Sequence, residues 1–333
     1  MKRWFFIGMG FFFLLALLVP LVVQSDYTLQ ILFRVFLFAA LGLAWNLVGG
    51  YTGQLSLGHA AYFGVGAYSL ALFSKAGVSP WVSVLLGMAL AVLSAAVIGS
   101  VSFRLRGPYF ALCTIAFAEV LRLTAKNLPN LTGGDVGVQV PLLFPYSSTK
   151  AFYISGVLLT LMVFALTAWI ERSRFGYYLL AIREDQDAAL AVGVNTSRYK
   201  LWILLISAAL TAIGGALYAS LFLFIVPDQV LAMEISTEIA IVAMLGGAGT
   251  LIGPLVGSIT LETASEIFKT FFKEANLLIY GVLIVVVVLF LPEGIVGTIA
   301  NKLRVFKTAP TAPFATPEPP DPEEEAQRAV ISE

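Results

Sequence analysis

The side chains that could carry out chemistry are few, and the single histidine, His59, comes first among them. Hydrolysis of the Ser-His-Asp kind would have to use this residue as its base, and no second histidine is left for a metal site. The single cysteine, Cys113, lies in an apolar run, which excludes a disulfide framework and a multi-thiolate metal site. We therefore expect a buried Cys113, and neither catalytic activity nor a metal or cofactor in this chain.

Two ionisable residues, Glu119 and Arg122, follow in the same apolar run. They are three apart, so on a helix they share one face and can form an ion pair. Ionisable groups inside apolar segments are costly, and for that reason they are candidates for function. Three interpretations stay open: an internal pair, residues that line a transport pathway, and a polar relay with His59 in an ion-coupled transporter or channel.

Glycine is concentrated in two stretches. The first reads GGYTGQLSLGH over residues 49–59, and the second reads LGGAGTLIGPLVG over residues 245–257. An unpaired backbone amide is costly in lipid, so a broken helix survives only inside protein or beside water. Pro254 is expected to kink or break the second stretch. The residues expected to break or pack helices are Gly49, Gly50, Gly53, Gly58, Gly246, Gly247, Gly253 and Pro254.

Interrupted apolar segments in the two halves of a chain point to a translocation pathway between inverted repeats. Close packing of helices through the Gly-x3-Gly-x3-Gly pattern at residues 249–257 is the alternative, and we favour it for the second stretch. For the first stretch we favour the pathway, because its polar side chains need partners. Our pathway candidates are Gln54, Ser56, His59 and Glu119.

The composition indicates the class of protein. The 333 residues are 59% hydrophobic and only 12% charged, with a mean hydropathy of +0.90, whereas soluble domains are about a quarter charged. A soluble enzyme, a disordered regulator and a nucleic-acid binder do not fit this composition. We predict an all-α polytopic membrane protein with roughly eight to ten transmembrane helices, broken or re-entrant segments and an inverted repeat.

Apolar runs of about 20 residues, the length that crosses a bilayer, recur along most of the chain. The first run begins at the basic N-terminus without a signal-peptide cleavage site, and is expected to be a retained span. The region 237–268, broken by glycine and proline, is either a re-entrant element or two short spans. Apart from this region, the expected spans, the first run included, cover residues 4–23, 29–48, 55–74, 80–101, 107–125, 151–170, 201–226 and 276–292.

Lysine and arginine are unevenly divided between the expected loops, which predicts the orientation. With the N-terminus inside, four of these residues lie outside: Arg34, Lys75, Lys126 and Lys150. Twelve lie in the cytoplasm: Lys2, Arg3, Arg104, Arg106, Arg172, Arg174, Arg183, Arg198, Lys200, Lys302, Arg304 and Lys307. Both termini are then cytoplasmic, so the region 237–268 must cross an even number of times. Eight or ten crossings satisfy this, and we favour ten.

Three further acidic residues are expected at the edges of spans. Glu238 is expected to be solvated near the outer edge. Glu262 and Glu266 are four apart and lie near two lysines, which predicts the end of an amphipathic helix.

The long cytoplasmic loop, residues 171–200, contains a further element. Residues 181–192 suit a short helix that Gly193 ends as a C-cap. This helix carries Arg183, Glu184, Asp185 and Asp187, and the charges followed by a small apolar run predict docking to a cytoplasmic partner. The chain has no P-loop sequence, so any ATP must be bound by another subunit.

Five stretches resemble one family: GGYTGQLSLGHAAYFGVGAY (49–68), RGPYFALCTIAFAEVLRL (106–123), LTGGDVG (131–137), AIREDQDAALAVGV (181–194) and LGGAGTLIGPLVGS (245–258). In this order they are similar to the LivM-type permeases, which are subunits of ATP-driven importers of branched-chain amino acids. The likeness covers about residues 35–295, and the first and fourth stretches are the most specific. Similar permeases occur in importers of urea, short amides and other amino acids, so the cargo stays open.

The resemblance implies a multi-pass permease of the bacterial inner membrane that works by alternating access and has no enzymatic activity of its own. Its implied partners are a second, LivH-type permease, two ATP-binding subunits, an external substrate-binding protein and the lipid bilayer, with no nucleic acid. It also implies that residues 181–194 form a coupling helix. Arg183, Glu184, Asp185 and Asp187 would contact the ATP-binding subunit, and Gly193 would end the helix. Gln54, Ser56 and His59 match the family's glycine-rich motif.

The net charge of zero conceals two unequal parts. From Thr308 onward the chain has six prolines, six acidic residues and one arginine, a composition that cannot bury a core. This part carries −5, and residues 1–307 carry +5 from 19 basic and 14 acidic residues. We expect a transmembrane permease domain over residues 1–300 and a disordered, acidic, proline-rich cytoplasmic tail over residues 301–333.

Overall fold

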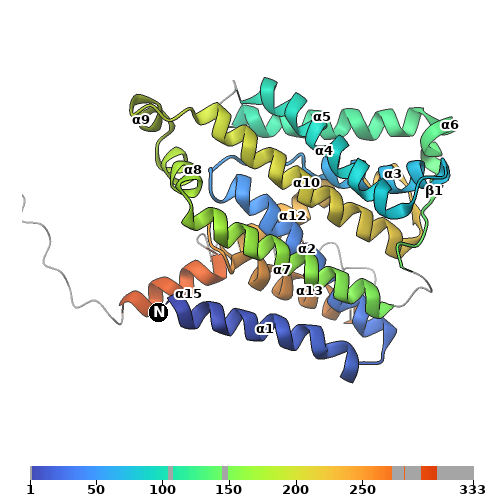
Figure 1. The fold of residues 1–333 in the computed structure, drawn as a ribbon, viewed down its shortest axis with the longest axis horizontal. Helices are drawn as coiled ribbons and strands as arrows, with labels where there is room; N and C mark the ends of the chain where they lie inside the picture. The colour runs from blue at the N-terminus through green and yellow to red at the C-terminus, as the bar shows by residue number, and fades with distance from the viewer. Residues whose placement is uncertain (1, 104–107, 145–148, 272–280, 282–293, 306–333) are drawn as a thin grey trace, which may run out of the picture. The chain divides into compact units, whose positions relative to one another are not determined.

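The structure is a computed structural model that describes residues 2–103, 108–144, 149–271, 281 and 294–305. The chain divides into two compact units, residues 1–298 and 299–333, and the architecture below is that of the first. Its described residues form long helices that run side by side (Figure 1). The expected span at 276–292 and most of the expected tail lie outside the described residues.

Six segments among the described residues are long and apolar enough to cross a membrane. Five of them match expected spans and confirm those predictions: Phe5–Val22, Asp26–Gly49, Pro80–Ser102, Thr149–Arg172 and Thr196–Phe222. The sixth, Pro227–Gly246, covers the start of the region that sequence left open. The protein is therefore an all-α polytopic membrane protein in its main elements.

The helices and strands of the first unit have the following bounds. The long helices are α1 (Lys2–Val22), α2 (Asp26–Gly49), α3 (His59–Lys75), α4 (Pro80–Ser102), α5 (Pro108–Asn127), α7 (Thr149–Arg172), α10 (Thr196–Phe222), α12 (Met233–Gly246) and α13 (Gly253–Phe271). The short elements are α6 (Pro129–Thr132), η1 (Gly134–Val136), β1 (Val138–Gln139), α8 (Arg174–Glu184), α9 (Gln186–Ala191), β2 (Phe224–Ile225) and α11 (Pro227–Val230), and α15 (Gly294–Val305) runs into the second unit.

Helix α2 lies at the centre of the first unit, where every residue from Val35 to Val48 is buried. It packs against α7, α10, α12 and α13. Hydroxyl groups of three of these helices donate hydrogen bonds of 2.6 Å to its carbonyl oxygens: Thr160 to Phe36, Ser207 to Ala44 and Ser258 to Val35. Such polar contacts hold helices together where lipid offers no hydrophobic driving force.

The region 237–268 forms parts of two helices, α12 and α13, with a non-helical connection at residues 247–252. Helix α13 runs beside α2 in the opposite direction. Asn46 of α2 bonds to Thr250 just before α13, whereas Tyr27, at the other end of α2, donates to Glu266 near the end of α13. Helix α13 therefore follows α2 over most of its length, but it is not among the six segments that are long and apolar enough to cross a membrane. Both interpretations of the region, two spans and a re-entrant element, stay predictions.

A small antiparallel pair of strands was not expected from the sequence. Val138 of β1 pairs with Ile225 of β2, and Gln139 pairs with Phe224. These strands and α6 lie at one end of the helices, and α8 and α9 lie at the other end (Figure 1). In the predicted orientation, the strand end is external and the end with α8 and α9 is cytoplasmic.

Candidate functional site

The first glycine-rich stretch breaks the helix, as predicted. Helix α2 ends at Gly49 and α3 begins at His59, so residues 50–58 form an irregular segment that we call break 1. Gly53 has a φ of +69°, a conformation that favours glycine. Ala60, in the first turn of α3, donates its backbone N–H to the Ser236 hydroxyl of α12 at 2.7 Å. The start of α3 therefore lies beside the first turn of another apolar helix, inside the protein.

The second stretch breaks at residues 247–252, which we call break 2. Pro254 lies in the first turn of α13, where its missing N–H costs no helical hydrogen bond. The predicted break is confirmed, but it precedes Pro254. The packing interpretation also fits, because a Cβ at Gly246 would lie 1.7 Å from the Gly253 carbonyl oxygen and one at Gly257 would lie 1.9 Å from that of Val242.

Breaks 1 and 2, about 200 residues apart in sequence, meet in the structure around Asn46 of α2. The fully buried Asn46 side chain accepts a hydrogen bond from the Gly249 backbone N–H at 2.7 Å and donates to the Thr250 carbonyl oxygen at 2.9 Å. A Cβ at Gly50 would lie 2.4 Å from the Gly249 nitrogen, so the two backbones touch. Sequence analysis missed Asn46, although a polar residue deep in an apolar span was the available signal.

His59 is fully buried between α3, break 1 and α10. Its Nε2 lies 2.9 Å from the Ser207 hydroxyl and its Nδ1 lies 3.2 Å from the Ser56 hydroxyl. Because Ser207 gives its proton to the Ala44 carbonyl, Nε2 must donate and Nδ1 must accept. Trp45 completes the cluster by donating to the Ser56 carbonyl oxygen at 2.7 Å. The polar groups of break 1 thus find partners inside the protein.

The four pathway candidates occupy different environments. Ser56 and His59 do not reach a surface in this conformation, and their hydrogen bonds indicate a structural role. Gln54 is half-buried, and Glu119, in the second half of α5, is partly exposed. The pathway assignment stays a prediction for all four residues.

The cytoplasmic loop differs from the expected single helix over residues 181–192, and that prediction is wrong. Asp185 is extended, with φ −154° and ψ 114°, and separates α8 from α9. Its carboxylate accepts hydrogen bonds from the backbone N–H groups of Asp187 and Ala188 at 2.8 and 2.9 Å. These two donors lower the pKa of Asp185, with Ala188 contributing most. Gly193 ends α9 as predicted, with a φ of +88°.

The charged residues of this loop take different directions. Arg183, Glu184 and Asp187 are all exposed, and Glu184 and Asp187 remain candidates for a partner contact. Arg183 instead lies against its own chain: a Cβ at Gly53 would lie 3.5 Å from its Cγ, and one at Gly249 would lie 2.0 Å from its Nη1. Arg183 thus reaches both breaks.

The neighbourhood of Arg183 includes Tyr51 of break 1. The Tyr51 hydroxyl donates to Glu171 at the end of α7 at 3.4 Å. Burial raises the pKa of Tyr51, and the Glu171 carboxylate raises it further, whereas the charge of Arg183 lowers it. The loop, α7 and break 1 therefore form one electrostatic neighbourhood.

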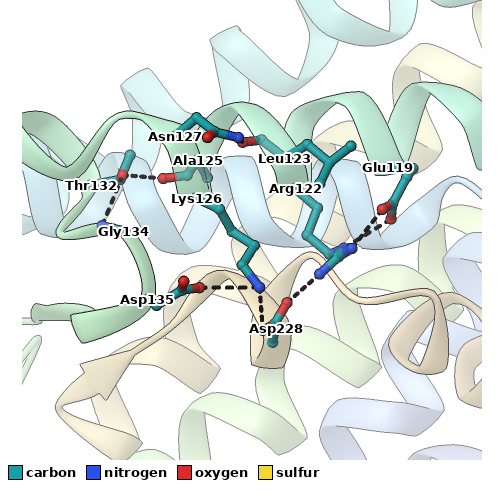
Figure 2. Close-up of polar contacts among 10 residues, drawn as sticks. All are labelled: Glu119, Arg122, Leu123, Ala125, Lys126, Asn127, Thr132, Gly134, Asp135 and Asp228. Atoms are coloured by element: carbon teal, nitrogen blue, oxygen red, sulfur yellow. Dashed lines mark hydrogen bonds and ion pairs between the residues drawn. The ribbon is translucent and has the colours of Figure 1, made fainter.

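A network of charges joins α5, η1 and α11 at the opposite end (Figure 2). Arg122 donates to both carboxylate oxygens of Glu119, at 2.8 and 2.5 Å, and also pairs with Asp228 of α11. Lys126 lies 2.9 Å from Asp228 and 3.1 Å from Asp135. The expected pairing of Glu119 with Arg122 is confirmed, and Asp228 was missed because only the fold brings α11 to α5.

The relay alternative is not supported by this arrangement. The hydrogen-bonded partners of His59 are Ser56 and Ser207, whereas those of Arg122 are Glu119 and Asp228. Among the described residues, no hydrogen bond links the two sets. A proton relay would need such a link or a chain of water between them.

A second ion pair lies inside the helices. Arg34 of α2 is 3.2 Å from Glu262 of α13 and 4.0 Å from Glu238 of α12. The Glu262 side chain is only 4% exposed, so within the expected amphipathic helix end it faces the protein interior. Pairing with Arg34 offsets part of the cost of burying this carboxylate. In the part of the chain that the structure covers, no group of three His, Cys, Asp or Glu residues is placed to hold a metal ion.

Comparison with known proteins identifies the family. Residues 27–288 match the family described as branched-chain amino acid transport system / permease component. The chain is 28% identical to the high-affinity branched-chain amino acid transport system permease protein LivM of Escherichia coli K12, over 88% of this chain and 76% of LivM. It is 25% identical to LivH of Salmonella typhimurium, over 78% of this chain and 91% of LivH.

A third relative is the permease protein BraD of Pseudomonas aeruginosa, 27% identical over 78% of this chain and 91% of BraD. No solved structure matches the chain. The family match covers most of the sequence and includes both breaks and the loop between α7 and α10. The chain therefore belongs to the permease family of branched-chain amino acid transport systems and is of the LivM type.

Proposed function

We propose that the chain is one of two permease subunits in an ATP-driven importer of branched-chain amino acids. It would work in the bacterial inner membrane with both termini in the cytoplasm. The family match and the LivM and LivH relatives support the transport role. The single observation that carries the coupling part is the contact of the α8–α9 loop with both glycine breaks through Arg183.

The energy would come from two ATP-binding subunits, and the cargo would be delivered by an external binding protein. The exposed acidic side chains of Glu184 and Asp187 suit a contact with a basic surface on an ATP-binding subunit. We do not include Asp185 in this contact, because its carboxylate already accepts the backbone hydrogen bonds that cap α9. The permease itself would bind cargo weakly, because a tight site would slow release.

Alternating access needs places where the helices can bend. Residues 50–58 and 247–252 lack the regular backbone hydrogen bonds of a helix, so they deform at lower cost than the helices they join. A shift of the α8–α9 loop when the ATP-binding subunits close would move these breaks. That movement would change the tilt of α3, α12 and α13 around the pathway.

Reconstitution tests the proposal. The complete complex in liposomes should take up labelled leucine only with ATP inside and the binding protein outside. The chain alone should show no flux, whereas an ion-coupled transporter would show flux without partners. Urea and a short amide serve as competitors. Competition by these compounds rather than by unlabelled leucine would contradict the assignment of branched-chain amino acids as the cargo.

The docking surface has its own test. Glu184→Ala together with Asp187→Ala should lower co-purification of the ATP-binding subunits, and exposed Arg198→Gln serves as the control in the same loop. Cysteine placed at position 187 in a Cys113→Ala chain should react with an impermeant maleimide only from the cytoplasmic side. Labelling from outside would overturn the orientation.

A further inference from the structure

We propose that Arg183 is a positioning residue that transmits movement of the α8–α9 loop to both glycine breaks. This inference rests on the proposed function and concerns how the loop acts on the transmembrane helices. It assigns Arg183, which remains an exposed residue, to a contact within its own chain, whereas the family resemblance assigned it to the surface of the ATP-binding subunit.

The first support is the fit of Arg183 against glycine. A Cβ at Gly249 would lie 2.0 Å from Nη1 and 3.1 Å from Cζ of Arg183, so a side chain there would displace the guanidinium from this place. A Cβ at Gly53 would lie 3.5 Å from Cγ, which is ordinary van der Waals contact. The aliphatic part of Arg183 therefore lies over break 1, and its charged end lies on break 2.

The second support is electrostatic. Helix α2 ends at Gly49, α12 ends at Gly246, and Arg183 itself lies in the last turn of α8. Helix C-termini carry partial negative charge from their unpaired carbonyl groups, and a cation there is stabilising. The guanidinium has five N–H donors, and its Nη1 lies beside Gly249, three residues after the end of α12. Moving the loop therefore changes the energy at this helix end.

The third support is the mechanical link between the breaks. Gly50 touches the backbone of Gly249, and Asn46 bonds to both Gly249 and Thr250. The two breaks therefore cannot separate without losing buried hydrogen bonds, so a displacement at Gly249 also reaches break 1. One side chain that touches both is enough to move them together.

Substitution of Arg183 in the complete complex tests the proposal. Arg183→Gln should leave co-purification of the ATP-binding subunits intact and lower leucine uptake per ATP hydrolysed by roughly fivefold, the size expected for loss of a charge at helix ends. Arg183→Lys keeps the charge and should retain part of the coupling. Arg198→Gln, an exposed arginine of the same loop, should stay near wild type. Wild-type coupling in Arg183→Gln would overturn the proposal.

Hydrogen exchange separates this proposal from the proposed function. In the wild-type complex, a non-hydrolysable ATP analogue should change exchange in the α8–α9 loop and in residues 50–58 and 247–252. In Arg183→Gln the loop should still respond and the two breaks should not. An equal response of the breaks in both proteins would overturn the role of Arg183. The wild-type complex could show the exchange change in both breaks and still take up no amino acid. That result would contradict the assigned cargo but not the role of Arg183.

A pair of glycine variants gives a matched control. Gly249 and Gly77 both have positive φ, at +79° and +89°, so alanine is strained at either position. Only Gly249→Ala also displaces the guanidinium, which can move because it is the end of a flexible side chain. Gly249→Ala and Arg183→Ala should therefore be non-additive in uptake per ATP. Gly77→Ala, where the added methyl meets nothing within 4 Å, should add to Arg183→Ala. Additivity in both pairs would contradict the proposal.

Discussion

The Asn46 side chain and the Gly249 backbone form a 2.7 Å hydrogen bond between residues 203 positions apart. The same side chain donates to Thr250, and its full burial excludes water as a replacement partner. Asn46 therefore fixes the end of α2 to the connection between α12 and α13. It is the residue through which the two breaks act as one structural unit.

Asn46→Leu should destabilise the protein because the partly buried N–H of Gly249 and carbonyl of Thr250 lose their partner. The expected loss is about 2–4 kcal/mol in the free energy of unfolding, from two unsatisfied, partly buried groups. Denaturant titration in detergent measures it. Asn127→Ala removes an exposed asparagine that bonds only within its own helix, and it should cost little. Equal effects would show that the Asn46 bridge contributes nothing specific.

Gly246→Ala should disrupt the contact between α12 and α13. The added methyl would lie 1.7 Å from the Gly253 carbonyl oxygen and 2.9 Å from the Gly257 nitrogen, which are backbone atoms that cannot turn aside. We expect a loss of about 3 kcal/mol or more, with lower yield of folded protein. Gly10→Ala, in a helix where nothing lies within 4 Å of the new methyl, is the control. It should be neutral or slightly stabilising.

His59→Ala should lower the thermal stability of the purified protein. It removes two buried hydrogen bonds and leaves a cavity beside Ser56 and Ser207, at a cost of about 3 kcal/mol. Ser56→Ala loses one bond and should cost less. If His59→Ala leaves the melting temperature unchanged but abolishes uptake, His59 acts in the translocation pathway rather than in stability.

Asp228→Ala should loosen α11, because Asp228 is the residue that joins Arg122 and Lys126 across two elements. Faster hydrogen exchange in residues 227–231 is expected, and 1 M salt should reduce the difference by screening the wild-type pairs. Asp135→Ala is the matched control, since Asp135 is 73% exposed and, among the described residues, forms its ion pair with Lys126 only. Similar exchange in both variants would contradict this role.

Asp185 should make the start of α9 sensitive to acid. Its pKa is lowered in the folded loop, so the carboxylate form is the one that the cap stabilises. That stabilisation is present above the unfolded pKa, near 4, and is lost as the pH falls through the lower folded value. Asp185→Asn should keep a cap without the pH dependence, and Asp185→Ala should speed amide exchange at residues 187 and 188 by roughly fivefold. Hydrogen exchange corrected for intrinsic rates measures both effects. Unchanged amide exchange in Asp185→Ala would show that Asp185 does not cap α9.

The long apolar runs could be predicted because each helix must satisfy its own backbone in lipid, a local requirement that hydropathy records. The glycine density around Gly53 and Gly247 likewise predicted irregular backbone, because positive φ favours glycine locally. The single helix over residues 181–192 was wrong because the Asp185 side chain competes with the helix for backbone N–H groups. Helix propensity alone does not show which of the two wins.

The sequence by itself determined the membrane class, most of the helices, the two breaks and the likeness to the permease family. Only the tertiary structure decided that the breaks meet at Asn46, that Arg183 lies on both, and that Glu262 is buried against Arg34. The physical reason is distance along the chain. A helix or a break is set by neighbours within a few residues, whereas a buried amide or carboxylate takes its partner from whichever helix the packing brings beside it.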